Sequence, residues 1–287
     1  MARGGIIVPE GLGEASVSTY ELDPRILQYV RTDLTDSQIK ALRNTPVNLM
    51  GQAAVGTNEF AIVEQVFVSF FNLAGPYTES ADNLLIEYDN GTRQVETATI
   101  HETVPGTLIA GNMTCTVTAA GMVNSPKAVT VAVATNDTEA QVATKVRAAL
   151  TADADVSAFF TVSGATTAVI LTAKVAVAND GTMNIATADD TSVGIATTAS
   201  SANTTAGVVG KAIMTIEATG LVDVDNSGVN TIPSAAVMNP SYIAATFVPP
   251  PASEIRIRNS GDGEYGGGGE TNIAVVTLLY RIEPDIS

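Results

Sequence analysis

The sequence has little of several residue types on which common site chemistries depend. Its 287 residues include one cysteine, one histidine and no tryptophan, and aromatic residues make up 5%. A single cysteine excludes an intramolecular disulfide framework. Any Ser/His/Asp, Cys/His or histidine-ligated metal site would have to use His101, yet neither G-x-S-x-G nor H-E-x-x-H surrounds it. We therefore expect a solvated or hinge-packing histidine, and a protein that is not an enzyme.

Basic charge is also scarce. Lys and Arg number 14 against 30 Asp and Glu, which gives a formal net charge of −16. Such a surface repels a phosphate backbone, so we expect no nucleic-acid partner. No stretch approaches 18 uncharged apolar residues, and the first residues contain no apolar run of signal-peptide length. We expect a soluble chain without a membrane anchor.

A glycine-rich stretch, GDGEYGGGGE at residues 261–270, contains the spacing G-x-G-x-x-G found in phosphate-binding loops. A dinucleotide loop leads into a helix, whose N-terminus holds the pyrophosphate. Here the strand-like run TNIAVVTLLYRI follows, and the other kinase motifs and G-K-[ST] are absent. We predict a hairpin loop and no cofactor. Gly267 and Gly268 either form a mobile tip or pack against a neighbouring subunit; in the second case, replacing both with Val should weaken assembly and leave the isolated fold intact.

The run DVDNSG places Asp223, Asp225 and Ser227 at the first oxygen-ligand positions of a Ca²⁺ loop. The twelfth position is Ser234 instead of a bidentate glutamate, and no helical pattern flanks the run. An Asx-rich turn is therefore favoured over a metal site.

Two other features have similarly plain interpretations. The carboxylate pairs Asp153/Asp155 and Asp189/Asp190 could serve glycoside hydrolysis, but no Trp or Tyr platform for a sugar lies near them in the sequence, which favours solvated turns. Cys115 alternates with apolar residues along a predicted strand and is expected to be a buried hydrophobic side chain.

The chain starts with an irregular segment. Residues 1–33 have several glycines and prolines and no sustained period, which predicts an extended arm. Residues 34–43 predict a short helix. Thr35 caps its N-terminus, and the Gln38 side chain completes the capping box. From Val47 onward the pattern favours strands, in agreement with the many β-branched residues.

Two later runs predict core strands. Residues 60–71 are apolar on both alternating faces, which predicts a strand covered on both sides, with a bulge or break at Glu64 and Gln65. The segment at 273–282 predicts a strand with one continuous buried face. That face consists of Ala274, Val276, Leu278, Tyr280 and Ile282.

A composition change marks a separate module. Between residues 103 and 207, Thr, Ala and Val dominate, and one helical pattern at 137–153, capped by Thr138 and Gln141, interrupts several strands. We predict a mainly β protein with three parts: an extended arm (1–33), a jelly-roll-like β-sandwich (34–102 plus 208–287), and an inserted small α+β domain with one helix on a sheet (103–207).

Specific runs resemble proteins encoded among tailed-phage structural genes. ALRNTPVNLM, AGPYTESADNLLIEYDNGT and the final TNIAVVTLLYRI resemble jelly-roll head decoration, or cement, proteins. Separately, the stretch from TVTAAGM to ILTAK is similar to a module that recurs in otherwise unrelated phage virion proteins. The resemblance implies a virion structural protein, made in the host cytoplasm, that binds the outside of the capsid and stabilises the head. The large insertion departs from the decoration-protein pattern. It leaves open an alternative, a tail-associated or receptor-binding protein whose insertion recognises a host-surface ligand.

The expected partners are the major capsid protein and further copies of this chain, with a trimer favoured over a dimer because cyclic association about lattice axes is common. Apolar side chains of the arm would make these contacts, since a lone arm cannot bury them; the competing interpretation is a disordered tail. The proposed contact residues are Ile6, Ile7, Val8, Tyr20, Leu22, Ile26, Leu27, Tyr29 and Val30, together with Gly267 and Gly268.

Overall fold

A computed structural model of the chain describes residues 27–51, 54–56, 59–71, 74–75, 77–78, 83–216, 230–231, 236–238, 249–261 and 264–284. Within this part the protein is mainly β, with several antiparallel sheets and a short helical region. The chain divides into two compact units: residues 1–90 together with 211–287, and residues 91–210.

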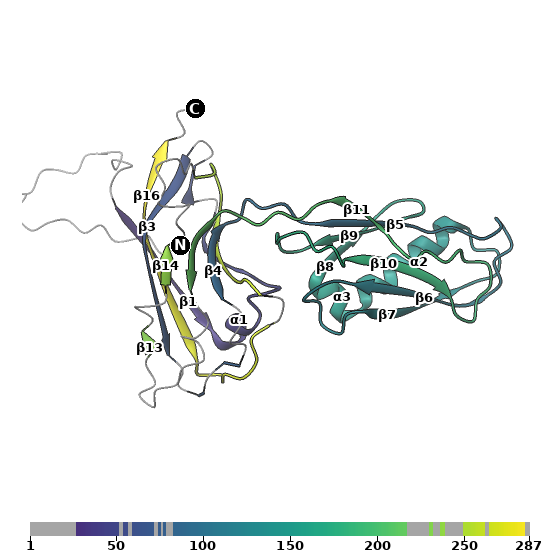
Figure 1. Ribbon diagram of the computed structural model, residues 1–287, viewed down its shortest axis with the longest axis horizontal. Coiled ribbons are helices and arrows are strands. Elements are labelled where there is room, and N and C mark those ends of the chain that lie inside the picture. Colours follow the sequence, from purple (N-terminus) through teal and green to yellow (C-terminus); the bar gives the residue numbers. More distant parts are fainter. Residues whose placement is uncertain are drawn as a thin grey trace, which may run out of the picture. The chain divides into compact units, whose positions relative to one another are not determined.

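The first unit contains two antiparallel sheets (Figure 1). In the first sheet the strand order is β1 (Gln28–Thr35), β16 (Ile273–Pro284), β3 (Glu59–Phe71) and β13 (Asn230–Thr231). In the second sheet it is β14 (Ala236–Met238), β12 (Ala212–Ile216), β4 (Leu84–Tyr88), β15 (Ile255–Asn259) and β2 (Val47–Met50).

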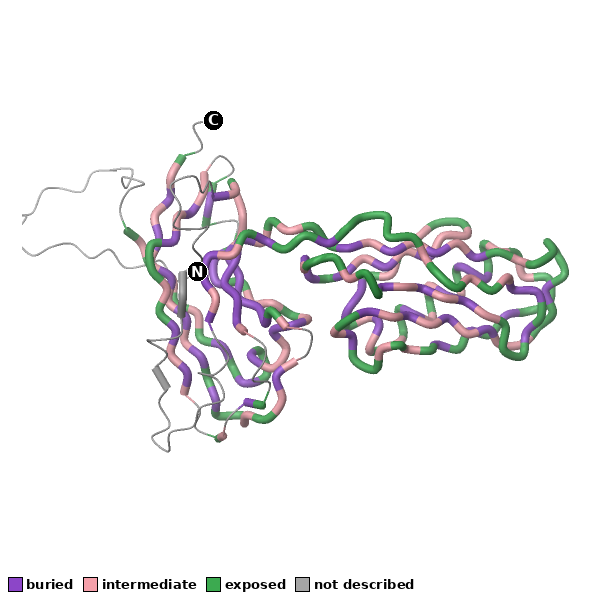
Figure 2. The backbone as a smooth tube through the Cα atoms, in the orientation of Figure 1, coloured by how far each residue is buried: buried purple, intermediate pink, exposed green. Residues whose placement is uncertain are grey.

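Side chains from both sheets form one hydrophobic core. Along β16, buried residues alternate with more exposed ones, as the period of two in its sequence predicts (Figure 2). A buried hydrogen bond also joins the two sheets, because the Tyr88 hydroxyl on β4 donates to the carbonyl oxygen of Ala61 on β3 at 2.6 Å.

The long strand β3 contains the predicted bulge. Gln65 pairs with Leu279 and Val63 with Tyr280, so Glu64 is the additional residue. The prediction that this strand is covered on both faces is wrong. Phe67 is 56% exposed, because its side chain points away from the core, toward which the partly buried Val66 and the buried Val68 point.

The predicted arm extends too far along the chain. Residues 28–33 belong to β1, which pairs with β16 over its whole length from Gln28↔Tyr280 to Thr35↔Ile273. Val30 packs against the core and Leu34 is buried, so this segment is fixed by its inward-facing side chains. Helix α1 (Asp36–Lys40) follows with the predicted cap, in which the Thr35 hydroxyl accepts from the Gln38 amide and the Gln38 side chain accepts from the Thr35 amide.

The second unit has two sheets instead of the single sheet that the sequence predicted. One has the order β10 (Asn184–Asp189), β6 (Gly111–Thr118) and β7 (Lys127–Val133). The other has the order β11 (Ala202–Thr205), β5 (Val95–Thr99), β9 (Ala168–Ala173) and β8 (Phe160–Ser163).

Two helices complete this unit. Helix α2 (Glu139–Ala152) begins at the predicted Thr138–Gln141 capping box and packs its buried face against β7, β8 and β9. A further short helix, α3 (Ala154–Phe159), was not predicted; the Asp153 carboxylate caps it by accepting from the amides of Asp155 and Val156.

The chain passes between the units through paired segments. At the edge of the first unit, the Tyr88 amide donates to the Lys211 carbonyl and the Lys211 amide donates to the Asn90 side chain, both at 2.9 Å. In the second unit, Thr92 and Val208 exchange two backbone hydrogen bonds of 2.9 Å. The unit boundaries at 90/91 and 210/211 differ from those placed at 102/103 and 207/208, so β5 lies in the second unit instead of the first.

A charged cluster is buried on the face of the second sheet opposite the core. Glu87 on β4 accepts three hydrogen bonds of 2.7–2.9 Å from the guanidinium groups of Arg256 and Arg258 on β15. Asp89 contacts Arg256 at 2.7 Å. Since Glu87 is fully buried and both arginines are 3% exposed, the carboxylate balances charges that cannot be hydrated.

Replacing Glu87 with Gln keeps the shape of the side chain and removes its charge, leaving two buried guanidinium groups without their main counter-charge. We expect Glu87→Gln to lower the free energy of unfolding by about 3 kcal/mol. The matched control is Glu64→Gln, which removes the partly exposed ion pair with Arg281 and should change stability by less than about 1 kcal/mol. Urea unfolding of both variants tests this, and equal small effects would contradict it.

Candidate functional site

An exposed apolar surface lies on the outer face of the first sheet, opposite the core. The strand register places Tyr29 beside Leu279, and Ile273 beside Phe71. Tyr29 is 41%, Ile273 38% and Phe67 56% exposed. We call this surface the outer apolar face, and it consists of Tyr29, Phe67, Phe71, Ile273, Val275 and Leu279.

Two charged side chains share this face on strand β1. Arg31 and Asp33 both point outward and form an ion pair of 2.8 Å, with each side chain more than half exposed. In such solvent exposure the pair adds little to the stability of the strand itself. Together the two residues give the edge strand β1 a positive charge followed by a negative one on its outer face.

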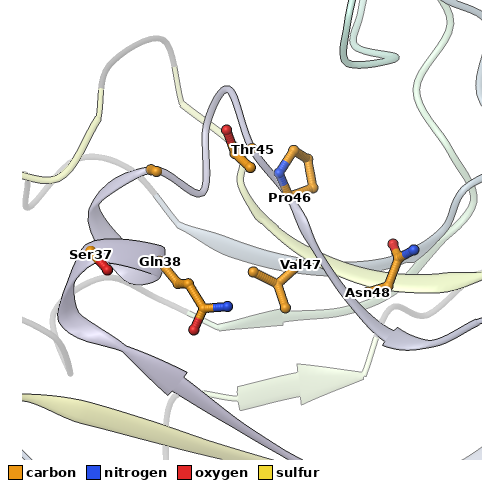
Figure 3. Close-up of a pocket in the computed structure, with 7 residues that line it drawn as sticks. Ser37, Gln38, Thr45, Pro46, Val47 and Asn48 are labelled. Carbon is orange, nitrogen blue, oxygen red and sulfur yellow. The ribbon is translucent and has the colours of Figure 1, made fainter.

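A shallow open pocket of about 420 Å³ lies between α1 and β2 (Figure 3). Its polar side chains already have partners within the chain: Gln38 caps α1, and the Asn48 amide donates to Glu254 at 2.7 Å. The lining contains neither a charged side chain nor a nucleophile other than hydroxyl groups, so it offers no arrangement for acid–base or covalent catalysis. The lining residues are Ser37, Gln38, Ala41, Thr45, Pro46, Val47 and Asn48.

The glycine-rich loop packs against its own unit. Gly267 and Gly268 both have φ near +64°, the left-handed conformation that glycine adopts without strain. A Cβ at Gly268 would lie 2.6 Å from both the Asp36 carboxylate and the Tyr77 ring. Gly267 also pairs with Tyr77 through a β-bridge. Gly268 is thus packed against its own unit, and we expect its replacement by Val to strain the isolated fold instead of leaving it intact.

Other contacts fix the same loop. The half-buried Glu264 carboxylate accepts from the backbone amides of Arg43 and Asn44, both at 3.0 Å, where the chain leaves α1. Burial raises the pKa of Glu264 above its usual value, while these two amides oppose the shift. Burial likewise raises the pKa of Tyr77, with the nearby Asp36 adding to the effect. These contacts hold the loop against its own unit.

The remaining candidates for catalysis are structural. His101 is 60% exposed, with its Nδ1 3.5 Å from Glu139. Lys127 bridges Asp153 and Asp155 at 3.4 and 2.5 Å, and its hydrogen bond holds the pKa of Asp155 below the usual value. A glycosidase acid would need a raised pKa. Both aspartates are held by Lys127, and Asp153 also caps α3, so their contacts are those of a structural ion-pair cluster.

Asp189 and Cys115 are also held inside the second unit. The Asp189 carboxylate accepts from the Ser192 hydroxyl and from the amides of Gly194 and Ile195, so it fixes a turn. Cys115 is fully buried on β6, as predicted, and burial raises the pKa of its thiol to about 12. A thiol with these properties is not a nucleophile at neutral pH.

Several predicted site residues lie outside the described part of the chain. They are the calcium-loop residues Asp223, Asp225 and Ser227 and the arm residues Ile6, Ile7, Val8, Tyr20, Leu22 and Ile26. Among the residues that are described, no group of three or more His, Cys, Asp or Glu side chains is placed to hold a metal ion. No helix in this part is long and apolar enough to span a membrane.

Of the predicted contact residues, Leu27 and Tyr29 are exposed, whereas Val30 packs against the core. Sequence reasoning missed Phe67 and Ile273, which belong to the outer apolar face. The signal was present in the strand 60–71, because a run that is apolar on both faces also fits a strand with one face reserved for a partner.

Comparisons with known proteins do not assign the chain to a family. No protein-family model matches it, and neither does any curated protein. Among solved structures, the D2–D3 domains of the flagellar cap protein FliD from Escherichia coli align with 80% of this chain and all of that one. The sequences are 12% identical and the TM-score is 0.25, so no conclusion rests on this similarity.

Replacing Gly268 with Ala should destabilise the first unit by about 2 kcal/mol, because the added Cβ meets Tyr77 and Asp36 and the backbone keeps a positive φ. Gly51→Ala is the matched control, since a Cβ there meets nothing within 4 Å. It should change the free energy of unfolding by less than about 1 kcal/mol. Thermal or urea unfolding measures both, and a stable Gly268→Ala variant would show that the loop can move aside.

Proposed function

We propose that this protein is a phage virion structural protein that decorates the outside of the capsid lattice and stabilises the head. The resemblance of its sequence to decoration proteins supports this, as does a strongly acidic composition that suits a protein partner better than DNA. We further propose that the two sheets of the first unit form a jelly-roll-like sandwich. Their shared core and antiparallel strands are compatible with that topology.

The observation that carries this proposal is the outer apolar face. On this face Tyr29, Phe67 and Ile273 are exposed among polar side chains such as Ser69 and Thr277. Large apolar side chains exposed together within a polar surround are typical of a surface that binds another protein. Phe67 and Tyr29 are aromatic side chains of the type that dominates binding energy at protein interfaces. Their burial against capsid subunits, repeated over many copies, would slow dissociation and hold neighbouring capsomers together.

The other predicted contacts extend this surface. Leu27 is 49% exposed at the point where the chain enters β1, next to the outer apolar face. The preceding arm would then reach capsid subunits or other copies of the chain. Self-association, with a trimer as the simplest cyclic form, is part of the proposal.

A second candidate function is adhesion by the second unit, as a tail-associated or receptor-binding protein. Val104, Ile109 and Val193 are each more than half exposed. Backbone pairing brings their loops together, since Ile109 bridges Val193 and the Thr103 amide donates to the Gly194 carbonyl at 2.8 Å. These side chains form a small apolar patch that a host-surface protein could contact.

Paired substitutions separate the two functions. Tyr29→Thr combined with Phe67→Thr should weaken binding to undecorated capsids by about tenfold or more, because two interface aromatics are lost and the β-branched replacement suits a strand. Val104→Thr combined with Ile109→Thr should leave capsid binding unchanged. Cosedimentation of the purified variants with capsids measures both. Adhesion would be favoured if the Tyr29/Phe67 variant kept its capsid binding and the Val104/Ile109 variant lost its binding to host cells.

Imaging of whole particles gives an independent test. Antibody-labelled virions viewed by electron microscopy should show copies distributed over the head. Label confined to the tail would contradict capsid decoration and support the adhesion alternative.

A further inference from the structure

Strand β1 ends the first sheet. In the part of the chain that the structure describes, β1 pairs with β16 on one side and with no strand on the other. An edge strand carries backbone groups that can pair with another strand. Its sequence, QYVRTDLT, and the alternation of its side chains therefore decide which partner it could accept.

We propose that β1 pairs with β1 of a second copy of this chain, antiparallel and about a twofold axis that passes through Thr32. The two four-stranded sheets would then join into one sheet of eight strands. This contact concerns the chain alone and does not depend on binding to a capsid, but it replaces the trimer suggested above with a dimer.

The order of charges on β1 supports this register. With Thr32 opposite Thr32 of the second copy, Arg31 lies directly opposite Asp33, and Asp33 opposite Arg31. All four side chains point to the same outer face, where Arg31 and Asp33 are 59% and 57% exposed. Opposite charges that face each other across strands stabilise the pairing.

Neighbouring registers are unfavourable. An axis through residue 31 places two guanidinium groups opposite each other, and an axis through residue 33 does the same with two carboxylates. Charged side chains on an edge strand normally prevent pairing. Here the order Arg-x-Asp places opposite charges together in the Thr32 register and like charges together in the adjacent registers. The charges therefore favour the Thr32 register.

The apolar residues of β1 fit the same arrangement. On the inner side, Val30 would lie opposite Leu34 of the second copy, and both already pack on the core of their own unit. On the outer side, the apolar faces of the two sheets would form one continuous surface flanking the Arg31–Asp33 pairs. A twofold contact of this kind closes as a dimer, in contrast to the trimer expected from the sequence.

Charge exchange tests the register. Arg31→Asp places two carboxylates opposite each other, and Asp33→Arg does the same with two guanidinium groups. Each change should weaken the dimer by about tenfold or more, whereas the double exchange, Arg31→Asp with Asp33→Arg, should restore wild-type affinity within about threefold. Both residues are exposed, so the fold should tolerate all three variants.

The measurement is sedimentation equilibrium of the full chain. The wild type should show twice the 29.5 kDa mass of one chain. A monomer at high concentration, a trimer, or a double exchange that fails to restore the dimer would each overturn the proposal.

Cysteine pairing tests the geometry directly. When Arg31→Cys chains are mixed with Asp33→Cys chains and oxidised, disulfide-linked dimers should form between the two variants. Neither variant alone should crosslink, because in the proposed register its cysteines do not face each other. The native Cys115 does not interfere, since it is fully buried. Equal crosslinking in the separate samples would contradict the register. It would not bear on capsid decoration, which the capsid binding of the Phe67 and Tyr29 variants tests separately.

Discussion

The two-unit organisation depends on one constraint: the chain that leaves the first unit at Asn90 must return to it at Lys211. It satisfies the constraint by leaving from β4 and returning into β12, two neighbouring antiparallel strands. In the second unit, Thr92 and Val208 continue the pairing. Gly91 is required there, because a Cβ would lie 2.5 Å from the Val208 carbonyl oxygen. The ends of a 120-residue insertion are thus held together by backbone hydrogen bonds, and each unit keeps a separate core.

The first unit places charge and apolar surface in an unusual distribution. Its most buried ionic group, Glu87 with two arginines, lies on the face of the second sheet opposite the core. Aromatic and aliphatic side chains, in contrast, are exposed on the outer face of the first sheet. The cost of burying the charges is offset by three hydrogen bonds to one carboxylate oxygen. The exposed aromatics have no such compensation within the described chain, and for that reason the outer apolar face is the surface on which the functional proposal rests.

Local signals in the sequence were sufficient for most elements. The capping boxes at Thr35 and Thr138 locate two helices, and the period of two identifies β16. The bulge at Glu64 followed from two polar residues within an apolar strand. The pairing of residues 28–33 with β16 was missed because glycines and prolines dominate the preceding segment, and the partner strand is more than 240 residues away. Such long-range pairing leaves no periodic signature in one strand alone.

The site was harder to predict than the fold. A strand that is apolar on both faces, such as β3, is compatible with a covered position and with an interface, and only exposure in the folded unit separates the two. The glycine loop shows the opposite difficulty. Four consecutive glycines suggested either a mobile tip or packing against a neighbouring subunit, whereas Glu264 and Tyr77 hold the loop against its own unit.

The pairing of the two chain segments that connect the units has a consequence for how such a protein could evolve. An inserted module needs to meet only one geometric requirement, namely two chain ends that lie side by side and continue a strand pair. Any compact domain with that property could be exchanged at residues 91 and 210 without altering the strands of the first unit. The first unit could then keep its own fold while the module that it carries is replaced.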